Sequence, residues 1–469
     1  VLFRSYKAGQ NVTVSKTLTL YAVYKKLPYT VTFNNNNGTS TSKIYTSLTM
    51  YASKNQKVTL PDVPKVKGYT NLGWTTEKGE TEPEYSAGDT VKITKATQFY
   101  AVRRKSNYYT VSYYLGNGST NAAYQKLTQT VEEGTVVTFA KVPARTGYVN
   151  QGWSSKKNSE KATAKAKCTV NKNITLYAVQ KKAVQLTFHR CDGSTWQKTT
   201  LAKGSSYSLP GVRDAEGYTF MGWSTKPMQS VSPQYEAEEK ITVNGNVDLY
   251  AVVFNRTTET DLTEDQLPQV DIYKYKQVIF VGDSRTEFME NVLTGMGESA
   301  TKNVKFVCSA GKGLDWFTTT GWAQLYSIVQ HDSNSILSKK TAVIFNFGVN
   351  DLSKSADYAE YYNWIAPQLK SKGCELYFMS VNPVNRLMLP NAGRADRSEA
   401  AVRSFNQYMK ANLSSAYTYI DMYSYLKSTG YSFASDHYGT GTVDDGLHYT
   451  TRTYKRIFAK CMDSLRVPA

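Results

Sequence analysis

Three copies of the pattern Gly-Tyr-x-x-x-Gly-Trp divide the first half of this chain into units of similar length. The copies read GYTNLGWTT (68–76), GYVNQGWSS (147–155) and GYTFMGWST (217–225). Each copy precedes a segment that ends in Tyr-Ala-Val, at 100–102, 177–179 and 250–252. Because a recurring unit must bury its apolar residues within itself or against its neighbours, this pattern predicts an array of small modules.

Alternation of apolar and polar residues predicts strands within each unit. The opening strands are expected at 29–33, 109–114 and 184–188, and second strands running into a proline at 57–61, 136–143 and 206–210. A period of two leaves one face buried and one solvated. We interpret the repeated Trp74, Trp153 and Trp223 as core residues rather than ligand-stacking platforms.

A fourth segment with Tyr-Ala-Val, LTLYAVY at 18–24, has no Gly-Trp before it. We therefore expect the chain to begin inside a repeat, at 1–25, with any export signal ahead of its first residue. Together the elements resemble the Listeria–Bacteroides repeat, also called the internalin B-repeat. The resemblance implies β-grasp-like modules at 28–103, 108–180 and 183–253, and a bacterial surface or secreted protein in which they act as spacers or adhesion modules.

The net charge of +18 lies mostly in residues 1–273. Such a basic surface could attract anionic cell-wall or host glycans, or the charges could simply be spread over solvated strand faces. No pattern typical of nucleic-acid-binding modules is present, so nucleic acid is not an expected partner.

The pattern changes after residue 253. Residues 254–274 are polar and not periodic, which indicates a linker or an extended lead-in. In residues 275–469, apolar strands are expected at 277–281, 303–311, 341–348, 375–383 and 417–422, and helices at 357–371, 398–413 and 453–465. Nearly continuous apolar strands that alternate with helices predict a five-stranded parallel sheet covered on both faces, with ligands bound beyond the carboxyl ends of its strands.

Ser284 stands directly after the first of these strands, in VIFVGDS (278–284), where a helix begins. A serine hydroxyl is a weak nucleophile until an imidazole removes its proton, and the imidazole needs an acceptor on its other nitrogen. Asp445 and His448, in DDGLHYT near the C-terminus, could supply that couple. The oxyanion formed by attack needs preorganised donors, for which the backbone of Ser284, a glycine after the second strand and the amide of Asn350 are candidates.

The α/β half resembles the SGNH, or GDSL-like, hydrolases in four blocks that occur in this order: GDS (282–284), SAGKGLDW (309–316), GVND (348–351) and DDGLHYT (444–450). The resemblance implies a flavodoxin-like α/β/α sandwich and a serine esterase with Ser284 as nucleophile, His448 as base and Asp445 as its partner. It implies an oxyanion hole of Ser284, Gly313 and Asn350, with Gly311 as the alternative to Gly313. Typical substrates are O-acetylated or otherwise acylated carbohydrates and small or lipid esters.

The remaining candidate residues receive other interpretations. His437, with Asp436 beside it, is the alternative base to His448, whereas His331 is expected to cap a helix and His189 to lie in a repeat strand. Asp283 and Asp351 are expected to organise turns rather than to take part in the chemistry, in which Asp351 would be a second acid. Arg285 is expected to be solvated or salt-bridged rather than to bind substrate.

Five scattered cysteines predict neither a disulfide framework nor a zinc ribbon, and no cluster has metal-ligand spacing. A membrane-spanning helix needs about 18 apolar residues, and no apolar run in this sequence approaches that length. We thus expect a surface or secreted serine esterase that deacylates O-acylated glycans without a cofactor. A carbohydrate-binding or adhesion protein without turnover, and an O-acyltransferase that uses the same residues, are the alternatives.

Overall fold

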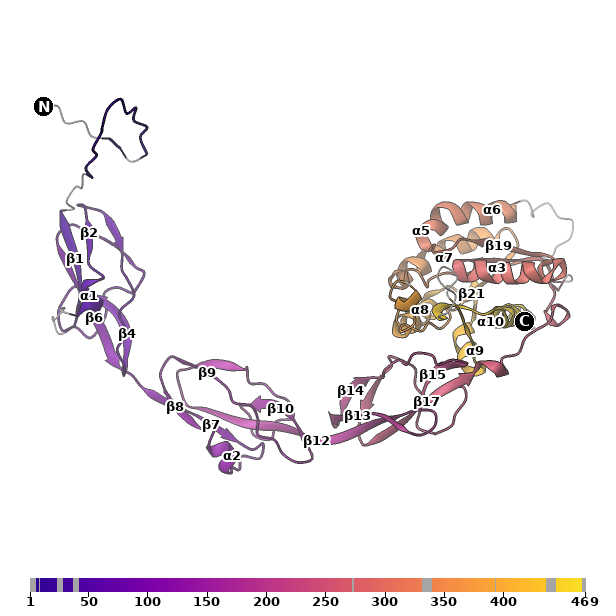
Figure 1. Cartoon of the computed structure of the whole chain (residues 1–469), viewed down its shortest axis with the longest axis horizontal. Coiled ribbons are helices and arrows are strands. Elements are labelled where there is room, and N and C mark those ends of the chain that lie inside the picture. Colours follow the sequence, from indigo (N-terminus) through magenta and orange to yellow (C-terminus); the bar gives the residue numbers. More distant parts are fainter. Residues whose placement is uncertain are drawn as a thin grey trace. The chain divides into compact units, whose positions relative to one another are not determined.

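The computed structural model describes residues 6–7, 9–22, 28–36, 42–271, 274–330, 340–392, 394–435 and 444–465. Two compact units make up the chain. The first comprises Val1–Ala144 and Asn150–Gln180, and the second comprises Arg145–Val149 and Lys181–Ala469. The first unit holds the first two complete repeats, and the second unit holds the third repeat together with the α/β half (Figure 1).

The first repeat is a four-stranded sheet with a short helix and a small second sheet. Its elements are β1 (Tyr29–Asn35), α1 (Lys43–Thr46), β2 (Met50–Ala52), β3 (Lys57–Thr59), β4 (Tyr69–Thr75), β5 (Thr90–Lys92) and β6 (Thr97–Lys105). The strand order is β2-β1-β6-β4, with β1 parallel to β6 and the outer pairs antiparallel, while β3 pairs with β5.

The second repeat follows the same plan. Its elements are β7 (Tyr108–Tyr114), α2 (Ala122–Gln125), β8 (Gln129–Glu132), β9 (Thr135–Thr138), β10 (Tyr148–Ser154), β11 (Lys167–Val170) and the first part of β12 (Ile174–His189). Strand β7 runs parallel to β12 and antiparallel to β8, and β9 pairs with β11.

The third repeat differs in one element. It is built from the rest of β12 and from β13 (Thr195–Ala202), β14 (Ser205–Ser208), β15 (Tyr218–Ser224), β16 (Lys240–Val243) and β17 (Val247–Asn255). Strand β13 pairs antiparallel with β12 and directly follows it, where the other two repeats carry the short helices α1 and α2. The β-rich character predicted for all three repeats is confirmed.

The repeated tryptophans are core residues, as predicted. Trp74 and Trp223 are fully buried and Trp153 nearly so. Each indole Nε1 donates a hydrogen bond to the backbone oxygen of a residue in the preceding proline-containing segment, namely Pro61, Ala140 and Pro210. A buried indole N–H needs such a partner, so the tryptophan packs the core and also fixes that segment against it.

The α/β half contains the predicted five-stranded parallel sheet. Its strands are β18 (Tyr275–Gly282), β19 (Val304–Cys308), β20 (Lys340–Asn346), β21 (Cys374–Met379) and β22 (Tyr417–Ile420). The order is β19-β18-β20-β21-β22 and every pair is parallel. This is the flavodoxin-like order, in which ligands bind at the carboxyl edge where the strand order reverses, between the first and third strands.

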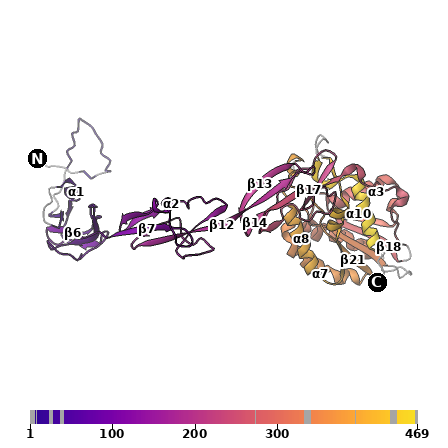
Figure 2. The same ribbon diagram turned by 90° about the horizontal axis from the view of Figure 1, so that it is seen from below.

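Helices cover both faces of this sheet (Figure 2). One face packs against α5 (Leu314–Trp316), η3 (Phe317–Gly321), α6 (Trp322–Gln330), α7 (Ser355–Lys370) and α8 (Glu399–Asn412). The other packs against α3 (Ser284–Met296), α4 (Glu298–Thr301), α9 (Met422–Thr429) and α10 (Thr451–Ser464). A two-stranded antiparallel sheet of β23 (Phe433–Ser435) and β24 (Asp444–Tyr449) lies between α9 and α10 in sequence.

Residues 254–271 form a packed lead-in, the second of the two interpretations of this segment. It contains two short 3₁₀ turns, η1 (Arg256–Thr258) and η2 (Glu264–Gln266). Phe254, Leu267 and Val270 are buried in the same apolar cluster as α3 and α10. The segment is therefore part of the core of the second unit.

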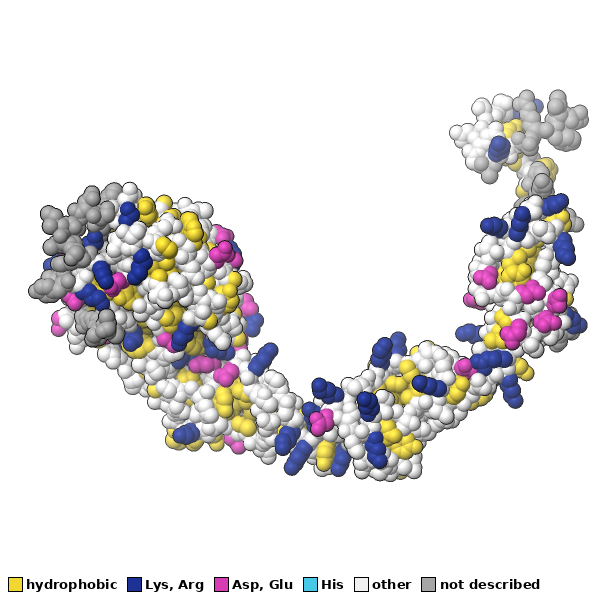
Figure 3. Space-filling view, turned by 180° about the vertical axis from the view of Figure 1, so that it is seen from behind, with side chains coloured by type: hydrophobic (Ala, Val, Ile, Leu, Met, Phe, Trp, Pro, Cys, Tyr) yellow, Lys and Arg dark blue, Asp and Glu magenta, His cyan; other side chains and the backbone are white. Residues whose placement is uncertain are grey.

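Lysine and arginine side chains are spread over the visible face of the repeats, with uncharged surface between them (Figure 3). This distribution agrees with the interpretation of the positive charge as belonging to solvated strand faces. Of the helices in the described ranges, none is both long enough and apolar enough to cross a bilayer.

Candidate active site

Ser284 lies at the carboxyl edge of the parallel sheet. Strand β18 ends at Gly282, and Ser284 is the first residue of α3. Asp283 is the N-cap of this helix, and its side chain accepts a hydrogen bond from the backbone N–H of Arg285 (3.0 Å). Asp283 thus organises the turn, and the serine hydroxyl and its N–H stand at the N-terminus of a helix, where negative charge is stabilised.

The imidazole of His448 lies between Ser284 and Asp445. Its Nε2 is 2.9 Å from Oγ of Ser284, and its Nδ1 is 2.5 Å from Oδ2 of Asp445. The other carboxylate oxygen of Asp445 accepts hydrogen bonds from the backbone N–H groups of Leu447 and His448 (2.8 and 2.7 Å). Ser284, His448 and Asp445 are 6, 2 and 0% exposed, respectively. This arrangement can move a proton from the hydroxyl to an imidazole whose other nitrogen is held by a carboxylate.

The environment favours a neutral imidazole. Burial lowers the pKa of His448 below its ordinary 6.5, against the hydrogen bond and charge of Asp445, which raise it. For Asp445, burial would raise the pKa, but its contacts with His448 and the two backbone N–H groups hold the pKa below its ordinary value. At neutral pH the couple is therefore a carboxylate beside a neutral base, the state required to activate a hydroxyl.

Arg285 corrects an expectation from the sequence. It is buried rather than solvated, and no carboxylate pairs with it in the described chain. Its guanidinium donates hydrogen bonds to the backbone oxygens of Leu447, Asn382 and Pro383 (3.0, 2.9 and 2.9 Å). Because Leu447 precedes His448, Arg285 ties the strand that carries the imidazole to the helix that carries Ser284.

The loops after β19 and β20 meet beside this cluster. The Nδ2 group of Asn350 donates a hydrogen bond to the backbone oxygen of Lys312 (2.8 Å), which leaves its second N–H for another acceptor. The carboxylate of Asp351 accepts hydrogen bonds from the backbone N–H of Leu314 (2.9 Å) and the hydroxyl of Tyr358 (2.7 Å). Asp351 is thus a structural residue that joins the two loops.

The two glycines considered for the oxyanion hole lie in different surroundings. A Cβ on Gly313 would lie 2.3 Å from a carboxylate oxygen of Asp351, so only glycine fits at that position without displacing this carboxylate. Gly311 is exposed, and a Cβ there would meet no atom within 4 Å. Its positive φ of +70° suits a turn. Gly313 is the one that packs against the Asn350–Asp351 loop.

The other histidines divide into two groups. His189 lies at the end of β12, where its ring nitrogens contact the backbone oxygen of Gly193 and the carboxylate of Asp248. It is a structural residue of the third repeat. His331, His437 and Asp436 lie outside the described residues.

Two arginines at the site belong to no motif recognised in the sequence. The guanidinium of Arg397 donates to the side-chain oxygen of Asn350 (2.8 Å) and to the backbone oxygens of Val349 (2.7 Å) and Ala395 (2.9 Å). It therefore fixes which way the Asn350 amide faces. Nη2 of Arg394 lies 3.5 Å from Oδ2 of Asp445. Both residues lie shortly before α8, and only their position in the folded chain distinguishes them from other arginines.

A hollow of about 410 Å³ adjoins Asn350. Most of its lining is polar or charged, and its polar residues are Asn350, Asp351, Ser353, Arg386, Asp396, Arg397 and Ser398. Nowhere in the described ranges do three or more His, Cys, Asp or Glu side chains gather so that they could hold a metal ion.

Comparison with known families agrees with both resemblances drawn from the sequence. The model of the Listeria–Bacteroides repeat domain matches residues 29–102, 109–179 and 185–252. The model of the GDSL-like lipase/acylhydrolase family matches residues 278–461.

Individual relatives are distant. Two proteins of Evansella cellulosilytica, whose names describe membrane proteins, are 28% and 27% identical to this chain over 254 and 220 residues. These alignments cover 53% and 46% of this chain, but 27% and 31% of the two relatives.

Among solved structures, an acylhydrolase of Bacteroides fragilis aligns over 43% of this chain and 93% of its own, at 16% identity and a TM-score of 0.27. An acetyl xylan esterase aligns over 41% of this chain and all of its own, at 12% identity and a TM-score of 0.28.

Proposed function

Since this chain carries a GDSL-like lipase/acylhydrolase domain at 278–461, preceded by Listeria–Bacteroides repeats, we propose that it removes acyl groups from O-acylated glycans. In this proposal Ser284 is the nucleophile, His448 the general base and Asp445 its partner. The observation that carries the proposal is the chain of contacts from Ser284 Oγ through His448 to Asp445, at 2.9 and 2.5 Å.

The first half-reaction transfers the acyl group to the enzyme. His448 Nε2 takes the proton of Ser284 as Oγ attacks the carbonyl carbon of the ester, and Asp445 stabilises the resulting imidazolium. The carbonyl oxygen becomes an oxyanion, which we assign to the N–H groups of Ser284 and Gly313 and to the amide of Asn350. As the carbon–oxygen bond to the alcohol breaks, His448 donates its proton to the departing oxygen.

Water completes the cycle. His448, again neutral, takes a proton from a water molecule that attacks the acyl carbon, and the same donors receive the oxyanion. Collapse breaks the bond to Ser284 Oγ, returns the proton to the serine and releases the carboxylic acid.

A sugar hydroxyl is the alcohol best suited to the hollow beside Asn350. Its amide, guanidinium, carboxylate and hydroxyl groups can exchange hydrogen bonds with a hydroxyl-rich molecule, whereas a long acyl chain would desolvate them without compensation. We place the enzyme at the bacterial surface or outside the cell because its repeats are typical of surface proteins and two relatives are named as membrane proteins.

The test is acetate release by the full chain from acetylated polysaccharides, with an aryl acetate as a general substrate. Wild type should release acetate from both, and Ser284→Ala should release none, while Ser309→Ala, a serine after the neighbouring strand β19, serves as the matched control. Retention of activity by Ser284→Ala would contradict the assignment. Activity on the aryl acetate and on lipid esters but on none of the polysaccharides would reject the glycan substrate.

A further inference from the structure

The third repeat makes buried polar contacts with the hydrolase domain. Asp214, in the loop before β15, has a fully buried side chain. Its carboxylate accepts hydrogen bonds from the backbone N–H of Phe220 (3.0 Å), from Nη2 of Arg256 (2.7 Å) and from Nδ2 of Asn385 (2.9 Å). Phe220 belongs to the repeat and Arg256 to the lead-in, but Asn385 belongs to the hydrolase domain, in the loop after β21.

The two partners of Asp214 outside the repeat, Arg256 and Asn385, each contact a residue next to Asp445 in the sequence. Nη2 of Arg256 also lies 2.6 Å from Oδ2 of Asp444, the residue before Asp445. The backbone N–H of Asn385 donates a hydrogen bond to the carbonyl oxygen of Gly446, the residue after it (2.9 Å). The side chain of Asp444, before Asp445, and the backbone oxygen of Gly446, after it, are thus each linked to Asp214 through one intermediate residue.

The fit at Gly446 is close. Its φ is +68°, a conformation that favours glycine, and a Cβ there would lie 2.5 Å from the backbone oxygen of Asn385. Only glycine therefore fits at position 446 beside the backbone of Asn385, and the side chain of Asn385 is held by the repeat. Besides Asp214, its amide also reaches the backbone oxygen of Val212 (3.1 Å).

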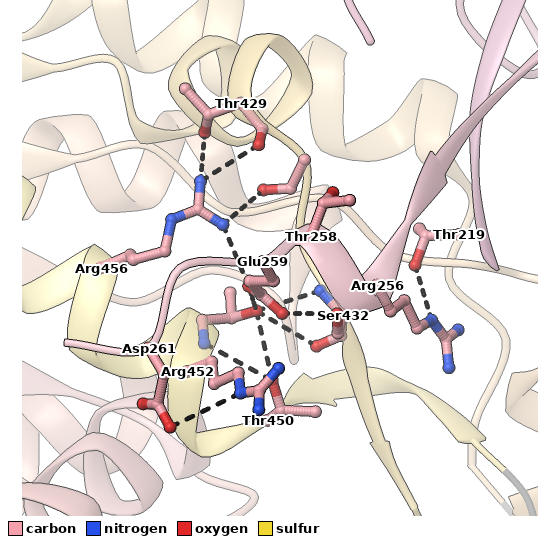
Figure 4. A network of polar contacts seen from close by, with 12 residues as sticks. Thr219, Arg256, Thr258, Glu259, Asp261, Thr429, Ser432, Thr450, Arg452 and Arg456 are labelled. Carbon is pink, nitrogen blue, oxygen red and sulfur yellow. Dashed lines mark hydrogen bonds and ion pairs between the residues drawn. The ribbon is translucent and has the colours of Figure 1, made fainter. Parts of the chain in front are cut away.

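The lead-in anchors the other side of the site. Figure 4 shows the side chain of Glu259 between Ser432 and Arg456. Glu259 is buried and accepts hydrogen bonds from the hydroxyls of Ser432 and Thr453 and from Nη1 of Arg456 (3.0 Å). Thr453 lies in the first turn of α10, which begins just after His448, so these contacts fix the start of that helix.

A buried cation joins the same two parts. Lys427 of α9 donates a hydrogen bond to the backbone oxygen of Met221 (2.6 Å) and pairs with Glu236 (2.7 Å), both in the third repeat. Lys427 also lies 3.5 Å from Glu399 of α8, so separation of the repeat from the domain would remove the nearer of its two carboxylates and leave a buried cation less well paired. The ring of Phe254 also lies against Gly430, where a Cβ would be 2.2 Å from it. The third repeat and the hydrolase domain are therefore held as one body.

We propose that the third repeat is part of the esterase site, in which Asp214 and Arg256 act as positioning residues that set the place of Asp445 through Asp444 and Asn385. This inference rests on the proposed function, because it assigns the repeat a task in the Ser284–His448–Asp445 arrangement. Small displacements of Asp445 should lower kcat, since general-base catalysis depends on distances held within about 0.5 Å.

The experiment is a double-mutant cycle in the full chain, with Asp214→Asn, Asp445→Asn and the double variant, read as kcat and KM on an aryl acetate. Asp214→Asn keeps the shape of the side chain but removes its charge. We expect kcat to fall on the order of tenfold with KM within about twofold, and the same substitution to have little further effect in Asp445→Asn, because its influence passes through that carboxylate. Arg256→Lys, which retains a cation near Asp444, should lose less than Arg256→Ala.

A matched control comes from the same repeat. Asp248 contacts His189 within the repeat and has a side chain that is 59% exposed, so Asp248→Asn should leave kcat unchanged. An equal loss of kcat for Asp214→Asn with and without Asp445→Asn would overturn the positioning role, as would no loss at all. Activity that survives Ser284→Ala would instead overturn the proposed function, so the two failures are distinguishable.

Thermal unfolding shows whether a loss of kcat comes from a displaced site or from a less stable protein. Burial raises the pKa of Asp214 to about 6, so at pH 8 its ionised form opposes folding, and the neutral amide of Asp214→Asn removes that cost. We expect its unfolding midpoint to lie within about 3 °C of wild type. If the midpoint falls further, the comparison of Arg256→Lys with Arg256→Ala decides, and equal kcat for those two variants would contradict the proposal.

Discussion

Oγ of Ser284 lies 2.9 Å from Nε2 of His448, although 164 positions of sequence separate the two residues. The serine begins a helix at the end of a central strand, and the histidine lies on β24, a strand outside the parallel sheet. Arg285 joins the two elements through the backbone oxygen of Leu447. The close approach of Ser284 to His448 is therefore supported by a buried arginine whose guanidinium binds backbone oxygens and not the two reacting side chains.

Asn350→Ala should lower kcat by roughly 10²–10³ while KM changes little, because a donor to the oxyanion acts in the transition state and not on bound substrate. Steady-state kinetics on an aryl acetate measure both constants. Asn363→Ala is the matched control, since the amide of Asn363 caps the end of α8 at the backbone oxygen of Asn412. A rise in KM with unchanged kcat would assign Asn350 to substrate binding instead.

Arg397→Lys should lower kcat by about tenfold, because a lysine cannot reach the three oxygens that the guanidinium holds and the Asn350 amide would be free to turn. The effect should disappear in the Asn350→Ala background. Arg103→Lys serves as the control, since Arg103 also donates to several oxygens but lies in the first repeat. A loss of the same size in the Asn350→Ala background would show that Arg397 acts independently of the amide.

The acidic limb of kcat/KM should have its midpoint below pH 6.5. The base must be neutral to accept the serine proton, and burial lowers the pKa of His448, so the neutral form persists to lower pH than for a solvated histidine. The profile on a substrate without titratable groups measures this pKa in the free enzyme. A midpoint above 6.5 would mean that the charge of Asp445 outweighs burial.

Much of the architecture follows from local patterns. The Gly-Trp spacing predicts the repeats because each tryptophan fills its own core, as the burial of Trp74 and Trp223 confirms. Continuous apolar runs predict the parallel strands because such strands are buried on both faces. Ser284, Asp445 and His448 stand out because their chemistry requires rare combinations at the ends of elements.

Other parts depend on contacts that no short stretch encodes. Arg397 is one arginine among several before α8, and only the fold brings it to Asn350. Asp214 lies in a loop of the third repeat, and only the fold brings it to Arg256 and Asn385, so its role arises from tertiary packing. The third repeat passes from β12 to β13 without the short helix of the other repeats, and the sequence does not predict this, since TWQKTTLA alternates no more clearly than neighbouring polar segments.

The most direct measurement is the mass of peptides from the full chain after reaction with a fluorophosphonate, which phosphonylates an activated serine. The account predicts one adduct, on Ser284, which forms much more slowly in His448→Ala and is absent from Ser284→Ala. An adduct on a different serine, or labelling of Ser284 at the same rate without the imidazole, would contradict it.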